Sequence, residues 1–429
     1  MRLFFSALAL CAAVLGQAAD KDYPLVEARE VTPRGGLPNF FRKAQTTGAE
    51  IKIGYLGGSI TAQNGWRVQT LAHFRQACPQ ASFTEINAAI GGTGSDLGVF
   101  RVQQDVLSKG PDLLFVEFAV NDGGADPQRI IRAMEGIVRQ TWKANPSTDI
   151  CFVYTITEAL SPPMLEGKLQ RSASAMEKVA DHYGIPSITL GMEVAKLAKA
   201  GKLLWRAKLP KTADERDALA DRFVFAPDST HPHESTGHVL YTQAIVRSLP
   251  ALAIANATPT AHVSGPALDP ANWERAKLAP ITAAKLSAGV ASADPATDAH
   301  AKVGAKRLPA MVRLTRPGQS LEFRFQGTHC AVYDVVGPAG GKVAVTLDGG
   351  KPFVVQRIDA YGTYPRLSTF IVGTDLPEGV HSVRLELLAD PIDKAAVLAK
   401  NKNKIDKPER FAPLEFHPGG LLLLGELVP

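Results

Sequence analysis

The sequence predicts two domains of different class: a three-layer, flavodoxin-like α/β/α domain with a five-stranded parallel sheet, and a C-terminal antiparallel β-sandwich of jelly-roll type. Between about residues 50 and 250, strand-like and helical segments alternate, which is typical of a parallel sheet covered by helices on both faces. From residue 320 onward, apolar residues recur at every second position in short runs, which favours an antiparallel sandwich. The 429-residue chain is long enough for both domains.

In the first half, five short segments rich in Val, Ile and Phe are the predicted strands: IKIGYL (51–56), FTEINAAI (83–90), DLLFVEFAV (112–120), DICFVYTI (149–156) and SITL (187–190). The intervening segments have helical spacing, most clearly where Ile130, Met134, Ile137 and Trp142 fall on one face. Residues 201–227 interrupt this alternation. We interpret them either as a lid at the mouth of a site or as a packed surface excursion.

The second half begins with a segment rich in Ala, Pro and Thr, residues 257–273, which is typical of a linker. The predicted strands that follow are LEFRF, CAVYDVV, KVAVTLD, PFVVQRI, STFIVG and HSVRLELL, with turn signals between them. We therefore assign residues 19–255 to the α/β/α domain and residues 256–429 to the sandwich. Within the sandwich, the Lys-rich residues 400–410 are expected to form an exposed loop.

Residues 1–18 predict a secretory signal peptide. Arg2 supplies the positive charge, Leu3 to Leu15 the apolar core, and Gly16 and Ala18 the small residues before a cleavage site. The apolar run is shorter than the ~20 residues that a membrane-spanning helix needs. We therefore expect a secreted or periplasmic protein without stable membrane insertion.

The overall composition excludes some partners. The formal net charge is +5, but Lys and Arg are scattered along the chain rather than clustered, which argues against nucleic acid as a partner. Removal of the signal peptide leaves three cysteines, Cys78, Cys151 and Cys330. The apolar runs around the last two predict small buried side chains, although one disulfide stays open as an alternative.

Chemically useful residues follow several of the predicted strands. Ser59 comes directly after the first strand, behind two glycines, in the segment GGSITAQ. The glycines of NAAIGGTGSD follow the second strand, and Asn121 follows the third in AVND. Asp228 and His231 stand three residues apart before the last predicted helix. Because ligands bind at the carboxyl edge of open α/β sheets, we expect these segments to meet there.

These residue types together predict acyl transfer. Ser59 is the candidate nucleophile, His231 the base that takes its proton, and Asp228 the group that orients the His231 ring. An oxyanion would be stabilised by the amides of Ser59 and Gly92 and by the Asn121 side chain. Asp122 is expected to orient the loop around Asn121 rather than to react.

The four segments resemble the blocks of the SGNH (GDSL-like) serine hydrolases, in the same order, over roughly residues 50–250. GGSI (57–60) resembles the nucleophile block, Gly92 in NAAIGG the glycine block, AVND the asparagine block and DSTH the Asp-x-x-His block. Two positions depart from the family pattern: Gly58 replaces an aspartate and Ala119 a glycine. The resemblance, which is to two-domain carbohydrate-esterase members, implies ester hydrolysis through an acyl-enzyme without a metal or organic cofactor.

Other interpretations stay open for some of these residues. Asp228, His231, His233 and His238 could form a metal cluster, as in a metal-dependent hydrolase, although His238 lies well inside the predicted last helix. The glycines at 91, 92 and 94 could cradle a phosphate, but they lack a nucleotide-binding fingerprint. Glu158 is expected to be a solvated carboxylate. The rings of Tyr361 and Tyr364 are expected either to stack on sugar or to pack in a turn.

We therefore expect a secreted serine esterase that hydrolyses acyl esters, most simply acetyl esters, on a carbohydrate or polysaccharide. One alternative is a lipase or arylesterase that acts on other small esters. Another is a non-catalytic carbohydrate-binding protein with the same fold, although such a protein would not need the full set of Ser59, Asn121, Asp228 and His231.

Overall fold

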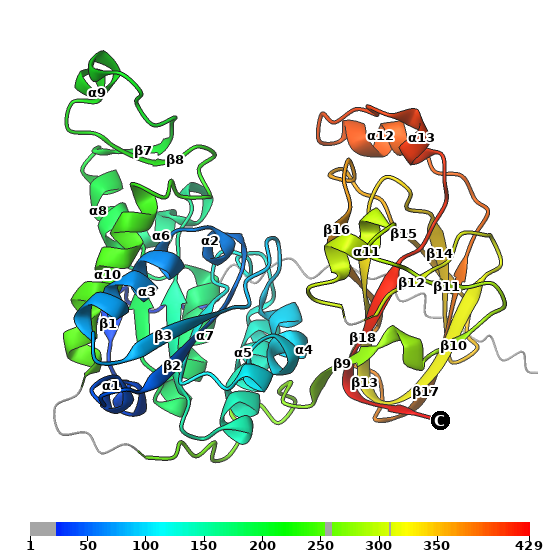
Figure 1. Cartoon of the computed structure of the whole chain (residues 1–429), viewed down its shortest axis with the longest axis horizontal. Helices are drawn as coiled ribbons and strands as arrows, with labels where there is room; N and C mark the ends of the chain where they lie inside the picture. Colours follow the sequence, from blue (N-terminus) through cyan, green and yellow to red (C-terminus); the bar gives the residue numbers. More distant parts are fainter. Residues whose placement is uncertain (1–22, 254–259, 309) are drawn as a thin grey trace, which may run out of the picture.

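A computed structural model describes residues 23–253, 260–308 and 310–429 of the chain. The predicted signal peptide, residues 1–18, lies outside the described residues. The predicted fold class is confirmed, because an α/β domain with a mostly parallel sheet lies beside a C-terminal antiparallel β domain (Figure 1). None of the helices in the described ranges is long and apolar enough to cross a bilayer.

All five predicted strands of the first domain are present, and they pair in parallel: β2 (Glu50–Gly57), β3 (Ser82–Asn87), β4 (Leu113–Glu117), β5 (Asp149–Tyr154) and β6 (Ser187–Thr189). A sixth strand that we did not predict, the two-residue β1 (Val31–Thr32), joins β6 in the antiparallel direction. The strand order is β1-β6-β5-β4-β2-β3. Strand β3 is added on one side of β2, and β4 and the later strands are added on the other side. The point between β2 and β4 is therefore a topological switch point, where open α/β sheets bind ligands.

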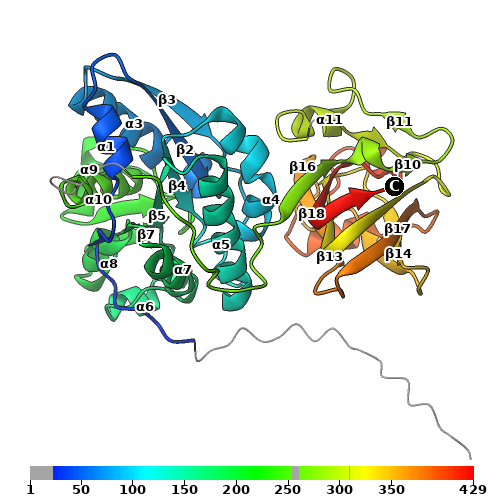
Figure 2. The ribbon, with the colours of Figure 1, turned by 90° about the horizontal axis from the view of Figure 1, so that it is seen from below.

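Helices cover both faces of this sheet (Figure 2). One face is covered by α1 (Pro38–Ala44), α3 (Trp66–Ala77) and α10 (Gly237–Leu252), and the other by α4 (Ser95–Asp105), α5 (Pro127–Ala144) and α7 (Arg171–Tyr183). The predicted apolar face of α5 is buried, and the Asp126 carboxylate caps the helix by accepting from the N–H groups of Gln128 and Arg129. The shorter helices are α2 (Ser59–Ala62), α6 (Pro162–Leu165) and α8 (Met192–Lys199).

Residues 201–227 form an arm that projects from the α/β domain (Figure 1). The arm contains β7 (Leu203–Arg206), α9 (Ala213–Leu219) and β8 (Phe223–Ala226), with the two strands paired in parallel. No residue of α9 is buried, whereas Val224, Phe225 and Ala226 of β8 are buried, so the helix is exposed and the strand is packed. Strand β8 leads directly into Asp228 and thereby fixes the start of the segment that carries His231.

The second domain is built around β13 (Ser320–Val336), in which two of the predicted strands are joined. The other strands are β9 (Ala276–Pro280), β10 (Lys285–Leu286), β11 (Ala291–Ser292), β12 (Val312–Arg313), β14 (Lys342–Leu347), β15 (Phe353–Gln356), β16 (Arg366–Gly373), β17 (Gly379–Leu387) and β18 (Pro418–Val428). Seven of these strands join β13 in one connected, eight-stranded antiparallel sheet, in the order β15-β14-β17-β13-β18-β9 with β10 and β16 also paired with β13. The strands form a single sheet because the long strand β13 pairs with β17 along its first half and with β16 along its second half.

Helices are few and short in this domain: α11 (Ala299–Gly304), α12 (Lys394–Ala399) and α13 (Pro408–Phe411). The Lys-rich residues 400–410 are mostly exposed, as expected; residues 400–407 connect α12 to α13, and residues 408–410 begin α13 instead of forming a loop. Cys151 and Cys330 are buried free thiols, as expected, and Cys78 is a half-buried free thiol.

The two domains share a hydrophobic core. Ala331, Tyr333 and Leu422 of the β domain belong to the same buried apolar cluster as the strands of the α/β domain. The connecting segment also packs closely on α5, where the Glu135 carboxylate accepts from the N–H groups of Leu268 and Asp269 at 2.6 and 2.8 Å. Such continuous burial couples the position of the β domain to the α/β domain.

Candidate active site

The turn that carries Ser59 requires small residues before it. Strand β2 ends at Gly57, and Ser59 is the first residue of α2. A Cβ atom at Gly58 would lie 1.8 Å from Oδ1 of Asn121. The glycine that departs from the family pattern is therefore what allows the Asn121 amide to approach the Ser59 turn.

Ser59, His231 and Asp228 form a hydrogen-bonded chain across two distant segments. Ser59 Oγ lies 2.8 Å from Nε2 of His231, and Nδ1 of His231 lies 2.7 Å from Oδ2 of Asp228. These distances are within the range for a nucleophile, its base and the group that orients the base. The Ser59 side chain is half-buried, so the hydroxyl remains open to a substrate.

Asp228 is fixed by its own backbone surroundings. Its Oδ1 accepts from the N–H groups of Thr230 and His231 at 3.0 and 2.8 Å. Partial burial raises the pKa of the Asp228 carboxyl, but the hydrogen bonds from His231 and Thr230 outweigh it, so the pKa lies below its usual value. Ser229 has a φ of +68°, an unusual conformation for a residue with a side chain, and marks a tightly constrained turn.

The glycine loop and the Asn121 side chain lie close to the Ser59 turn. A Cβ atom at Gly91 would lie 3.5 Å from the Cβ of Ser59, so the glycine loop passes directly beside the candidate nucleophile. Gly92 has a φ of +73°, which favours glycine. Within the described part of the chain, no group accepts a hydrogen bond from the N–H of Ser59 or of Gly92. These donors and the Asn121 amide are available to an oxyanion.

Residues 55–238 match the model of the GDSL-like lipase/acylhydrolase family. The α/β domain of this chain belongs to that family. It is an acylhydrolase domain, as the resemblance of the four segments implied. No curated protein matches the sequence of the chain.

The two-domain arrangement is similar to that of solved structures of a two-domain esterase, CEX, described as active on acetylated mannans. The structure of that esterase co-crystallised with mannopentaose has a TM-score of 0.70 and 18% identity, and the match covers 95% of this chain and 100% of that one. A second structure of CEX has a TM-score of 0.67 and 19% identity, covering 92% and 99%. At this level of identity the match establishes a shared fold.

The acylhydrolase domain contains one important residue that the sequence analysis missed. Glu117, at the end of β4, is fully buried and accepts from the hydroxyls of Thr61 and Thr155 at 2.8 and 2.6 Å. Burial raises the pKa of the Glu117 carboxyl, while hydrogen bonds from Thr155, Thr61 and the Gly58 N–H lower it. Glu117 thus ties the Ser59 turn to two neighbouring strand ends. Its position as the one acidic residue in the apolar run LLFVEFAV is the feature of the sequence that could have indicated this role.

Asp122 contacts the glycine loop rather than only the loop around Asn121, and Glu158 is exposed, as expected for a solvated carboxylate. The Asp122 carboxylate accepts from the Ser95 N–H at 3.0 Å and lies 2.2 Å from where a Cβ at Gly94 would be, so it orients the glycine loop. Burial raises the pKa of Asp122 to about 7. Glu158 is exposed, and its N–H donates to the Ser229 carbonyl at 3.1 Å.

The metal alternative at the His231 segment finds no support among the residues described. His233 Nε2 lies 2.9 Å from the Ala207 carbonyl oxygen, and the Trp66 N–H donates to His238 Nδ1 at 3.1 Å. These nitrogens therefore already have partners within the protein. The other His238 nitrogen, Nε2, lies 3.2 Å from Gln63 Oε1, so a cation would have to displace a partner to use the His238 ring.

In the described ranges, one group of side chains is close enough to share an ion: Asp298, His300 and His417 of the β domain, whose ligand atoms lie within 4.8 Å of one another. Arg313 Nε lies 3.7 Å from Asp298 Oδ2, and Arg313 Nη2 lies 2.5 Å from Glu415 Oε1. The imidazole rings stack with their centroids 3.9 Å apart. The guanidinium opposes a further cation, so this cluster fits a charge-balanced structural network better than a metal centre.

His238 gives a testable pH dependence. Burial lowers the pKa of His238 to about 4, and the neutral ring accepts the Trp66 N–H. As the pH falls from about 6.5 to about 4, the unfolded chain binds a proton there that the folded chain does not, so the free energy of unfolding falls, by about 3 kcal/mol at most from this group. Chemical denaturation of wild type and His238→Gln at pH 7 and pH 4.5 checks this. A variant with the same loss as wild type would contradict the assignment.

The steric role of Gly58 can be tested directly. Gly58→Ala is expected to lower kcat for p-nitrophenyl acetate by about tenfold or more, because the new methyl group displaces the Asn121 amide from the Ser59 turn. Gly124→Ala is the matched control, since a Cβ there meets no atom within 4 Å. Equal activity of the two variants would show that Asn121 does not need this close approach.

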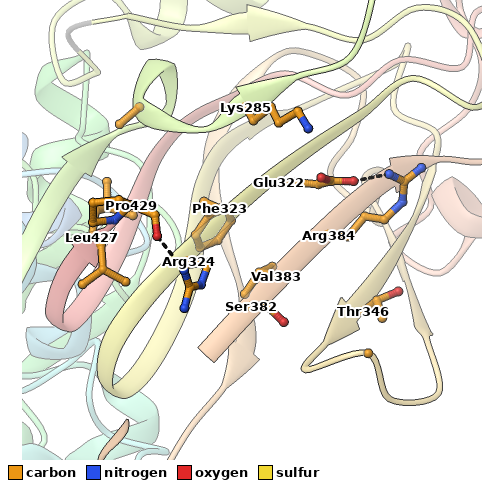
Figure 3. Close-up of a pocket in the computed structure, with 13 residues that line it drawn as sticks. Lys285, Glu322, Phe323, Arg324, Thr346, Ser382, Val383, Arg384, Leu427 and Pro429 are labelled. Carbon is orange, nitrogen blue, oxygen red and sulfur yellow. Dashed lines mark hydrogen bonds and ion pairs between the residues drawn. The ribbon is translucent and has the colours of Figure 1, made fainter. Parts of the chain in front are cut away.

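A separate cavity of about 770 Å³ lies on the β domain, and no residue of the α/β domain lines it. Phe323, Val383 and Leu427 form its apolar wall, and Glu322 pairs with Arg384 at its edge (Figure 3). Tyr361 and Tyr364 are exposed by more than half, and the Arg366 guanidinium lies over the Tyr361 ring. Neither tyrosine lines this cavity.

Proposed function

We propose that this chain is an exported serine esterase that removes acetyl groups from a carbohydrate such as an acetylated mannan. The observation that carries the proposed chemistry is the hydrogen-bonded chain from Ser59 through His231 to Asp228. The shared two-domain fold of an esterase active on acetylated mannans supports the substrate class. Export rests on the signal-like residues 1–18.

In the first half of the reaction, His231 Nε2 takes the proton of the Ser59 hydroxyl as Oγ attacks the acetyl carbonyl carbon. The negative charge on the carbonyl oxygen is stabilised by the N–H groups of Ser59 and Gly92 and by the Asn121 amide. Asp228 stabilises the imidazolium. The C–O bond to the sugar then breaks, and the sugar oxygen leaves with the proton from His231.

In the second half, water replaces the sugar. His231 takes a proton from the water, whose oxygen attacks the acetyl carbon on Ser59. Acetate leaves, and the proton returns from His231 to Ser59 Oγ. The balance of the two halves is one ester and one water in, and one alcohol and one acetic acid out, so no cofactor is needed.

Acetate release from acetylated mannan oligosaccharides tests the proposal, with acetylated xylan oligosaccharides and p-nitrophenyl octanoate as competing substrates. We expect the mannan to give a kcat/KM above that of both. A preference for the octanoate ester would favour the lipase alternative. Binding to the oligosaccharide without acetate release would favour the non-catalytic alternative.

A further inference from the structure

The loop that carries Gly92 is held from behind by two arginines. Arg307 Nη2 donates to the carbonyl oxygens of Asn87 and Ala89 at 3.3 and 3.2 Å. Arg101 Nη1 donates to the carbonyl oxygen between them, that of Ala88. Three consecutive carbonyl groups at the start of the loop therefore bind guanidinium groups.

The other side of the same peptide units is also held. In a trans peptide, the N–H points away from the preceding C=O, so a bound carbonyl directs the amide to the opposite side. The amides that follow the three carbonyls each have an acceptor: Ala88 N–H donates to Tyr55 O at 3.0 Å, Ala89 N–H to Asn87 Oδ1 at 3.1 Å, and Ile90 N–H to Gly57 O at 3.0 Å. Each peptide unit is thus fixed at both ends immediately before Gly91 and Gly92.

A buried carboxylate joins the two arginines. Asp105 Oδ2 lies 2.9 Å from Arg101 Nη1 and 3.1 Å from Arg307 Nη1. The Asp105 and Arg101 side chains are almost completely buried, and the Arg307 side chain is 17% exposed. Charged groups with so little access to water interact strongly and hold a defined geometry.

Arg307 comes from the β domain, whereas Arg101 and Asp105 belong to α4. The backbone around Arg307 is itself fixed, because its N–H donates to Gly304 O at 2.8 Å and its carbonyl accepts from Gln104 Nε2 at 2.8 Å. The β domain therefore reaches the back of the loop whose front faces Ser59.

We propose that Arg307 is a positioning residue of the acyl-transfer site and that the β domain acts through it on the oxyanion donors. This proposal rests on the proposed function, because it assigns the Gly92 N–H to the oxyanion. The β domain therefore contributes to the chemical step itself. Its contribution should be seen even with a small ester that carries no sugar for the β domain to bind.

The test compares Arg307→Ala and Arg307→Lys with a matched control, Asp375→Asn. The control removes the charge from another inter-domain pair, Arg132–Asp375, whose side-chain atoms are 3.7 Å apart, and Asn tolerates the φ of +50° there. With p-nitrophenyl acetate, Arg307→Ala is expected to lose about tenfold to hundredfold in kcat with little change in KM, because misplaced donors affect the transition state. Arg307→Lys should recover part of the loss, since one ammonium cannot span both carbonyls.

Hydrogen exchange gives a second readout that does not depend on activity. Peptides covering residues 87–94 are expected to exchange faster in Arg307→Ala than in wild type and the control. Wild-type kcat together with wild-type exchange would overturn the proposal, and so would an equal loss in Asp375→Asn. If Ser59→Ala keeps its activity, the proposed function fails, whereas faster exchange in Arg307→Ala would still show that Arg307 holds the loop.

Discussion

Ser59→Ala is expected to lower kcat for p-nitrophenyl acetate by about 10⁴- to 10⁶-fold, because Ser59 Oγ is the hydroxyl that lies 2.8 Å from His231 Nε2 and the variant removes it. Ser59 is half-buried and the His231 side chain is accessible to water, so the free energy of unfolding of the variant should equal that of wild type. Initial rates under saturating substrate and a thermal unfolding curve measure both effects.

Ser108→Ala is the control for this variant. The Ser108 hydroxyl is exposed and donates to the Gln104 carbonyl at 2.9 Å, beyond the end of α4. It should keep wild-type activity. A Ser59→Ala protein as active as Ser108→Ala would mean that Ser59 serves only the turn.

Asn121→Ala is expected to lower kcat by about 10²- to 10³-fold with a small change in KM, the usual cost of losing one side-chain oxyanion donor. The structure gives the reason, because the Asn121 amide lies against Gly58 beside the Ser59 turn. Kinetics with p-nitrophenyl acetate separate kcat from KM.

Asn121→Asp sharpens this prediction, since it keeps the shape of the side chain but replaces the N–H₂ donor with a second oxygen. We expect a loss at least as large as that of Asn121→Ala, because a carboxylate repels the developing oxyanion. Wild-type kcat in either variant would contradict Asn121 as an oxyanion donor and would mean that the backbone amides alone stabilise the oxyanion.

The sequence predicted that the segments carrying Ser59, Gly92, Asn121, Asp228 and His231 meet at one edge of the sheet. Parallel strands end at one edge of their sheet, so the segments that follow β2, β3 and β4 had to meet there. The short contacts of Ser59 with His231 and of His231 with Asp228 fit that expectation. The order of the four segments also predicted the family that the α/β domain belongs to.

The parts that were not predicted depend on contacts between distant residues. Strand β18 lacks the alternating pattern because both its faces are covered: Leu422 packs into the core shared with the α/β domain, and Leu421 and Leu423 into the core of the β domain. Strand β1 has too few residues to show a period. Arg307 lies more than 200 residues from the carbonyls that it binds, so no local pattern could reveal its role.

The most direct test of the central claim is to label the protein with diethyl p-nitrophenyl phosphate and map the modified peptide by mass spectrometry. An activated serine attacks the phosphorus, p-nitrophenolate leaves, and the phosphoryl group stays on Oγ. We expect one label, on Ser59, and none in the Ser59→Ala variant. Wild-type protein that hydrolyses p-nitrophenyl acetate but carries no label on Ser59 would contradict Ser59 as the nucleophile.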